Sequence, residues 1–214
     1  MKEVAVSTNL STRTDEQAPS ARELDVELLA LDLETCTRCV GTLENIEEAI
    51  GMVQRVFGVT GTHVRVRKTL IESEEQARHH RFETSPTVRV NGRDIAFETL
   101  ESRCDSCTDL CGCEEGTNCR VWRYRGQEYT EAPVGLVVEA ILGEAYGETP
   151  QMASDPTAFE DVPENLSRFF AGRSIIEAAA ASSCCTPEEQ EVCCEPAAKA
   201  SCCGSSEGES CGCR

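Results

Sequence analysis

The chain has 214 residues, of which 40% are hydrophobic and 5% aromatic, and its 38 acidic side chains against 20 basic ones give a formal net charge of −18. This charge argues against a nucleic-acid or anionic-membrane partner, because either would repel the protein. The 15 cysteines would suggest a disulfide scaffold in a secreted protein. However, the segment from Met1 to Leu24 has no apolar stretch of the signal-peptide kind, and no later run approaches the ~18 apolar residues of a membrane span. We therefore expect a cytoplasmic protein whose clustered cysteines are catalytic or metal-binding.

The first half of the chain alternates between strand and helix patterns. A nearly continuous apolar run predicts a strand in the middle of a sheet, and an amphipathic helix follows it. An alternating segment then predicts a second strand, and a short polar helix capped by Ser73 comes next. These elements are expected at residues 26–33, 40–58, 63–71 and 72–81, with the first helix ended by Gly58.

Two hairpins and a helix are predicted next. Asn91-Gly92 between alternating runs is the strongest short hairpin signal, and a second alternating segment, 120–129, turns at Arg125-Gly126. Pro133 opens an amphipathic helix that closes between Gly143 and Gly147. The sequence therefore predicts an α/β domain.

The first cysteine pair, Cys36-Thr37-Arg38-Cys39, lies between the first strand and the first helix. A helix N-terminus and a cation such as Arg38 can lower a thiol pKa from ~8.5 to roughly 7 or below, which favours a redox-active dithiol. We expect Cys36 to be the more exposed, attacking thiolate, and Cys39 to resolve a mixed disulfide or share a captured ion. The alternatives are half of a structural zinc site, with Cys104 and Cys107 as the other half, and a pair that is merely packed and inert.

A cysteine-rich insertion, residues 101–119, separates the first hairpin from the last helix. Its five thiols are Cys104, Cys107, Cys111, Cys113 and Cys119. A polar loop of this length needs a cross-link to be ordered, and four thiolates around Zn(II) would contribute on the order of 10 kcal/mol to its folding. The alternatives are a disulfide-exchange partner for Cys36 and an unstructured thiol loop.

The end of the chain carries a cysteine repeat with a nine-residue period. It consists of Cys184-Cys185, Cys193-Cys194, Cys202-Cys203 and the spaced pair Cys211-x-Cys213. A bond within an adjacent pair would be strained, because the two Cα atoms are only about 3.8 Å apart, so both sulfurs stay available. Such pairs suit As(III), Hg(II), Cu(I) or Zn(II). A low-complexity tail with incidental cysteines is the alternative, which the fixed register disfavours.

We divide the chain accordingly and expect no metal role for its histidines. The segments are a disordered leader (1–22), a folded domain (23–147), a linker (148–163), a short helix (164–181) and a disordered tail (182–214). His63 lies in a predicted strand and His79-His80 at the end of a short helix, so all three are expected to be structural.

The strand before Cys36-x-x-Cys39 and the step Ser85-Pro86-Thr87-Val88 into a hairpin resemble the thioredoxin-like fold, and in particular an uncharacterised thioredoxin-like family of bacteria and archaea. The resemblance covers about residues 24–146 and implies a sandwich in which a mixed sheet is flanked by helices. It also implies that Pro86 is cis and faces the dithiol, with Ser85 beside it. The chain departs from that family in having Thr37-Arg38 between the cysteines, in having no Trp before Cys36, and in its insertion.

The tail suggests a first hypothesis for function, because it resembles the vicinal-cysteine tails of bacterial arsenical-resistance proteins. The protein would be a cytosolic carrier that binds and transfers a soft metal or metalloid ion, arsenite favoured, and so contributes to resistance. Its partners would be the ion and a thiol reductant or an efflux or resistance protein. The second hypothesis is an enzyme, a thiol–disulfide oxidoreductase using Cys36, Cys39 and Pro86, and the third is a zinc-stabilised interaction module.

Overall fold

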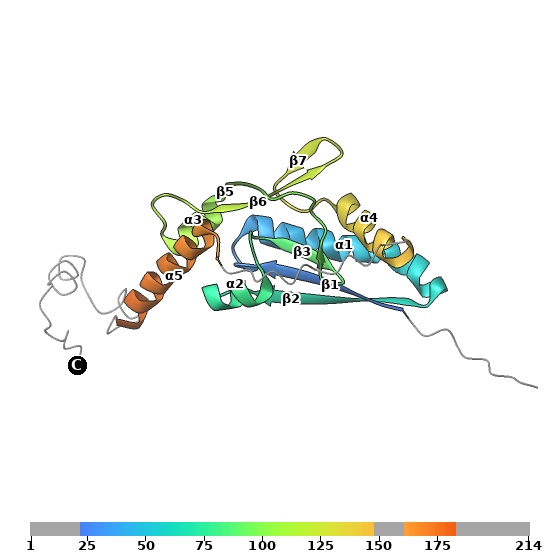
Figure 1. Cartoon of the computed structure of the whole chain (residues 1–214), viewed down its shortest axis with the longest axis horizontal. Helices are drawn as coiled ribbons and strands as arrows, with labels where there is room; N and C mark the ends of the chain where they lie inside the picture. Colours follow the sequence, from blue (N-terminus) through green and yellow to red (C-terminus); the bar gives the residue numbers. More distant parts are fainter. Residues whose placement is uncertain (1–21, 148–160, 183–214) are drawn as a thin grey trace, which may run out of the picture.

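The computed structural model describes residues 22–147 and 161–182, and Figure 1 shows their arrangement. Most of the predicted leader, linker and tail, including all the tail cysteines, lies outside the described residues, although Arg22 of the leader belongs to the first strand and Ser182 of the tail to the last helix. No helix in the described ranges is long and apolar enough to cross a membrane.

The centre of the molecule is a mixed four-stranded sheet in the order β2-β1-β3-β4. Its strands are β1 (Arg22–Ala30), β2 (Thr62–Leu70), β3 (Thr87–Val90) and β4 (Arg93–Asp94). Strand β1 pairs parallel with β2 and antiparallel with β3. The hairpin between β3 and β4 turns at Asn91 and Gly92, which both have positive φ, as the Asn-Gly signal predicted.

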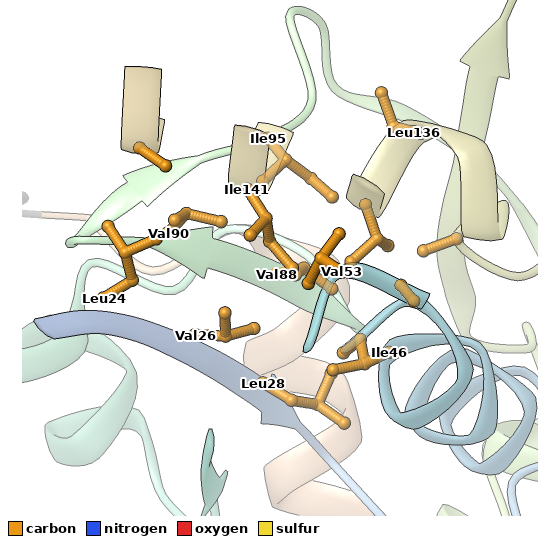
Figure 2. Packing of buried hydrophobic residues seen from close by; sticks show 14 of the residues in the cluster. Leu24, Val26, Leu28, Ile46, Val53, Val88, Val90, Ile95, Leu136 and Ile141 are labelled. Atoms are coloured by element: carbon orange, nitrogen blue, oxygen red, sulfur yellow. The ribbon is translucent and has the colours of Figure 1, made fainter. Parts of the chain in front are cut away.

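Helices α1 (Thr37–Thr60) and α4 (Val134–Tyr146) pack against one face of this sheet and against each other. Figure 2 shows the core between them, where side chains of β1 and β3 meet those of both helices. Its fully buried members include Val26, Leu28, Ile46, Val88 and Ile141.

Two predicted boundaries are wrong. Strand β1 runs from Arg22 to Ala30 instead of 26–33, because the turn around Asp32 ends it before the first helix. Helix α1 continues for two residues past Gly58 and ends at Gly61, which adopts the left-handed conformation and donates its backbone N–H to the carbonyl oxygen of Phe57.

The remaining elements lie at one end of the sheet and above it (Figure 1). They are α2 (Glu74–His80), the strands β5 (Leu100–Arg103), β6 (Asn118–Tyr124) and β7 (Gln127–Tyr129), α3 (Asp105–Cys111) and α5 (Glu164–Ser182). The three strands form a second sheet in the order β5-β6-β7. Ser73 caps α2 by accepting a hydrogen bond from the backbone N–H of Gln76 (3.2 Å), as expected.

The insertion is therefore not a loop. It consists of β5, the short helix α3 and the start of β6, and α5 packs along α3. The prediction of a polar loop failed because the buried face of α3 consists largely of cysteines, with Cys107 and Cys111 at 0% and 1% exposure. Cysteine buries as a small hydrophobic residue, although the surrounding sequence is polar.

Candidate metal centre

Four cysteine sulfurs gather at the end of the sheet where α1, α3 and β6 meet. They belong to Cys36, Cys104, Cys107 and Cys119, and all lie within 4.8 Å of one another. Contacts join Cys36 to Cys107 (3.5 Å), Cys36 to Cys104 (3.9 Å) and Cys107 to Cys119 (3.3 Å). None of the four is more than 3% exposed. We call these residues the four-cysteine group.

Both helices that supply this group present a Cys-x-x-Cys motif at their first turn. Cys36 is the N-cap residue of α1, and Cys104 is the N-cap residue of α3. The carboxylate of Asp32 fixes the first of these turns by accepting hydrogen bonds from the backbone N–H groups of Thr35 and Cys36, both at 2.6 Å. The cysteines are thus held by the capping structure of two helices.

Thr108 fixes the second turn. Its hydroxyl donates to the carbonyl oxygen of Cys104 (2.7 Å) and accepts from the backbone N–H of Thr117 (2.9 Å). The first contact holds the start of α3, and the second holds the chain that leads into β6 and Cys119. One buried side chain therefore sets the spacing of the three cysteines that the insertion contributes.

Arg38 joins α1 to the insertion. Its guanidinium donates to the carbonyl oxygens of Arg103 (2.5 Å), Ser102 (3.3 Å) and Cys119 (3.3 Å), and to the hydroxyl of Ser102 (3.0 Å). The sequence suggested that this cation acts on the thiols by its charge. Its hydrogen bonds instead hold β5 and β6 against the first turn of α1.

Helix α5 covers the group from the other side. Asn165 makes two hydrogen bonds with the backbone of Asn118, which precedes Cys119, at 2.8 and 2.9 Å. Leu166, Phe169 and Phe170 are buried in the same hydrophobic cluster as the cysteines. This lining keeps water away from the sulfurs, and so strengthens electrostatic interactions among them.

Cys39 is the fifth free thiol of this region and lies outside the four-cysteine group. Its sulfur is 3.5 Å from the Ser85 hydroxyl, which in turn accepts a hydrogen bond from the backbone N–H of Leu31 at 3.1 Å. The Ser85–Pro86 peptide bond is cis. The expectation that Cys36 is exposed is wrong, because Cys36 and Cys39 are both 0% exposed.

The remaining two cysteines of the insertion do not join this group. Cys111 and Cys113 are bonded to each other as a disulfide, with Cα atoms 5.2 Å apart. They lie under Gly172 of α5, where an added Cβ would come 2.3 Å from the carbonyl oxygen of Cys111. The five thiols predicted as one metal set are therefore divided into three ligand candidates and one disulfide.

Contacts among the thiols separate their pKa values. Contacts with Cys104, then Cys107 and Cys119, lower the pKa of Cys36, and contacts with Cys107 and Cys119 lower that of Cys104 to about 7. The pKa of Cys107 and that of Cys119 are raised, in each case chiefly by contact with Cys104. Negative charge thus concentrates on Cys36 and Cys104, and S–H groups of the other two stabilise it. A bound cation would replace those protons.

The spacing of the sulfurs suits a tetrahedral ion. With zinc–sulfur bonds of about 2.3 Å, the sulfurs of a tetrahedral Cys₄ site lie roughly 3.8 Å apart. The three contacts of 3.3 to 3.9 Å bracket that value. The group can therefore hold a metal ion such as Zn(II) with little movement.

The sequence indicated the components of this site but not their combination. The zinc alternative joined Cys36 and Cys39 to Cys104 and Cys107, whereas the structure brings Cys119 to the group and leaves Cys39 outside. The second Cys-x-x-Cys motif thus indicated two of the ligands, but no local pattern distinguishes Cys119 from Cys111 and Cys113. Within the described part of the chain, His63, His79 and His80 belong to no group with metal-ligand spacing.

Comparison with known proteins gives one result. Residues 24–141, more than half of the chain, match the family described as "Domain of unknown function (DUF2703)". This range contains the whole four-cysteine group and Cys39. No curated protein and no solved structure matches the chain. The chain therefore belongs to the DUF2703 family.

Proposed function

We propose that this protein binds a soft, thiophilic metal ion in the four-cysteine group, and that Zn(II) fits it best. The observation that carries this proposal is the buried set of four sulfurs with contacts of 3.3 to 3.9 Å. A Cys₄ set without an open position is typical of a site that binds an ion rather than one that activates water.

We further propose that the protein is a carrier and that its domain is thioredoxin-like. The order strand, helix, strand, helix, hairpin and terminal helix supports the fold, as does the position of Ser85 beside Cys39. The tail follows α5 directly in the sequence. In this proposal its cysteine pairs collect the ion, and the four-cysteine group then holds it. A thiol reductant or an efflux or resistance protein in the cytoplasm would be the partner.

Arsenite is the cargo that the tail favours. As(III) binds three sulfurs, and the insertion alone offers three in Cys104, Cys107 and Cys119. Zn(II) and As(III) would then use overlapping sets of ligands, with Cys36 required only for the tetrahedral ion. A Cys36→Ser variant that loses Zn(II) and keeps As(III) would support this division.

The test uses the full chain with the eight tail cysteines replaced by serine, so that the tail adds no binding. We expect one zinc per chain by elemental analysis, and the visible bands of tetrahedral thiolate coordination after Co(II) substitution. Cys119→Ser should abolish both, and the matched control Cys39→Ser should keep both. A chain that purifies without zinc and does not take up Co(II) would contradict the proposal.

A second function, thiol–disulfide exchange, has one specific observation in its favour. Cys36 begins α1 with a lowered pKa, and Cys39 lies one turn further on beside Ser85. The complete burial of both thiols disfavours large substrates. Turnover of a protein disulfide by the metal-free chain, abolished in Cys36→Ser, would support this function over metal binding.

A further inference from the structure

Cys36 takes part in two arrangements that exclude each other. It is one of the four sulfurs of the four-cysteine group, and it is also the partner of Cys39 across the first turn of α1. The two thiols are also within hydrogen-bonding contact of each other. Residues three positions apart at a helix start have Cα atoms about 5 Å apart, which is within the usual disulfide span of roughly 4.4–6.8 Å.

Cys39 is also the thiol that metal binding leaves free. With an ion in the four-cysteine group, Cys36, Cys104, Cys107 and Cys119 are ligands, and Cys111 and Cys113 are already bonded to each other. Among the described residues this leaves Cys39 as the one uncommitted thiol, and it lies against the ligand Cys36. The Ser85 hydroxyl, 3.5 Å away, holds it in place.

We propose that Cys36 and Cys39 form a site of oxidative modification by hydrogen peroxide, and that their disulfide releases the metal ion. This inference rests on the proposed metal binding, because the modification removes one of the four ligands. The modification would make the protein a peroxide-responsive metal donor.

The reaction balances with peroxide as the oxidant. The sulfur of Cys36 attacks one peroxide oxygen, the O–O bond breaks, and a sulfenic acid and hydroxide form. The thiol of Cys39 then attacks that sulfur, the S–O bond breaks and water leaves. Two sulfurs lose two electrons in total, and the peroxide gains them. The metal ion keeps three cysteine ligands and exchanges into solution.

Burial selects this class of oxidant. Both thiols are 0% exposed and belong to the same buried cluster as Phe169 and Phe170 of α5. A molecule of the size of hydrogen peroxide can enter a packed interior during brief local opening, whereas a protein disulfide or glutathione disulfide needs a much larger opening. We therefore expect peroxide to release the ion at least tenfold faster than an equal concentration of glutathione disulfide.

Loss of Cys36 from the site would weaken the connection between the insertion and α1. Cys36 is the single member of the four-cysteine group that belongs to α1, and the other three belong to the insertion. Oxidation therefore breaks the metal link between the insertion and the α1 side of the domain. Arg38 remains as the hydrogen-bonded connection between these parts.

The test is zinc release from the full chain with serine at the eight tail cysteines, loaded with one zinc and followed with a chromogenic chelator. We expect peroxide to release the zinc from this chain, and Cys39→Ser to bind zinc equally and release it at least tenfold more slowly. Reduction with dithiothreitol should restore zinc binding to the oxidised chain that retains Cys39. If the loaded chain cannot be prepared, metal binding itself has failed, which is a different outcome from unchanged release in Cys39→Ser.

Tryptic peptide mapping identifies the bond. Arg38 lies between the two cysteines, so trypsin places them in separate peptides, 23–38 and 39–55, which the proposed disulfide would link. All five insertion cysteines fall in one peptide, 104–120. We expect the linked pair to appear with the same time course as zinc release. A second internal disulfide in 104–120 with no linked pair would overturn the proposal.

Discussion

Replacing Arg38 tests whether the connection between α1 and the insertion sets the affinity of the metal centre. The Arg38→Ala variant removes four hydrogen bonds to the backbone and hydroxyl of residues 102, 103 and 119, while it leaves all four sulfurs in place. Three of the four candidate ligands belong to the segment that Arg38 holds. In this variant the metal would have to order the segment as it binds. The free energy needed for this ordering would weaken metal binding.

The magnitude follows from the contacts. A hydrogen bond from a charged group contributes about 1.5–3 kcal/mol when buried. Arg38 is only partly buried and its four bonds share one guanidinium, so water compensates for much of the loss. We expect about 2 kcal/mol in total, which corresponds to roughly thirtyfold weaker zinc binding.

The assay is competition between the protein and a chromogenic chelator of known zinc affinity. Arg38→Lys should give an intermediate affinity, because an ammonium group cannot reach as many carbonyls as a guanidinium. Arg55→Ala, on the exposed side of the same helix, should leave the affinity unchanged. An affinity of Arg38→Ala within threefold of the unmodified chain would refute this reasoning.

Three further substitutions test the surroundings of the site by urea unfolding. Burial raises the pKa of Asp32, but the hydrogen bonds from the backbone N–H groups of Cys36, Thr35 and Glu34 outweigh it and leave this pKa below its ordinary value. The ionised Asp32 carboxylate accepts these hydrogen bonds more strongly than the amide of Asp32→Asn would, which we expect to add about 1 kcal/mol of stability. This difference should be present above pH ~5 and disappear as the pH falls below ~4, through the folded-state pKa. A difference that does not vary with pH would contradict this. Asp94→Ala leaves the 2%-exposed Arg120 without its 2.7 Å ion pair and should cost about 2–4 kcal/mol, whereas the exposed-pair control Glu98→Ala should cost less than ~1 kcal/mol. Gly172→Val places a side chain against α3 and should both destabilise the chain by about 2 kcal/mol and weaken zinc binding; unchanged zinc affinity would show that α5 is not needed to hold the centre.

Local patterns in the sequence identified most of the elements around the site. The Asn91-Gly92 hairpin, the Ser73 cap and the start of α4 after Pro133 all depend on residues that are neighbours in the chain. Their backbone preferences act before any tertiary contact forms, so the element types could be predicted. Element ends were less accurate: Gly58 stays helical, and α1 ends only at Gly61, where the backbone is left-handed.

The sequence by itself determined that the candidate functional groups of this protein are cysteine thiols. It also determined that one Cys-x-x-Cys pair begins a helix after the first strand. It could not determine which sulfurs meet, because Cys36 and Cys104 are 68 residues apart and come together only when the insertion folds onto α1. Tertiary structure also decided that Cys119 joins the group and that Cys39, one turn along α1 from Cys36, lies outside it beside Ser85. The physical reason is that local backbone structure at a helix start fixes the position of its own cysteine. Which other sulfurs lie next to that cysteine depends on how α3, β6 and α5 pack.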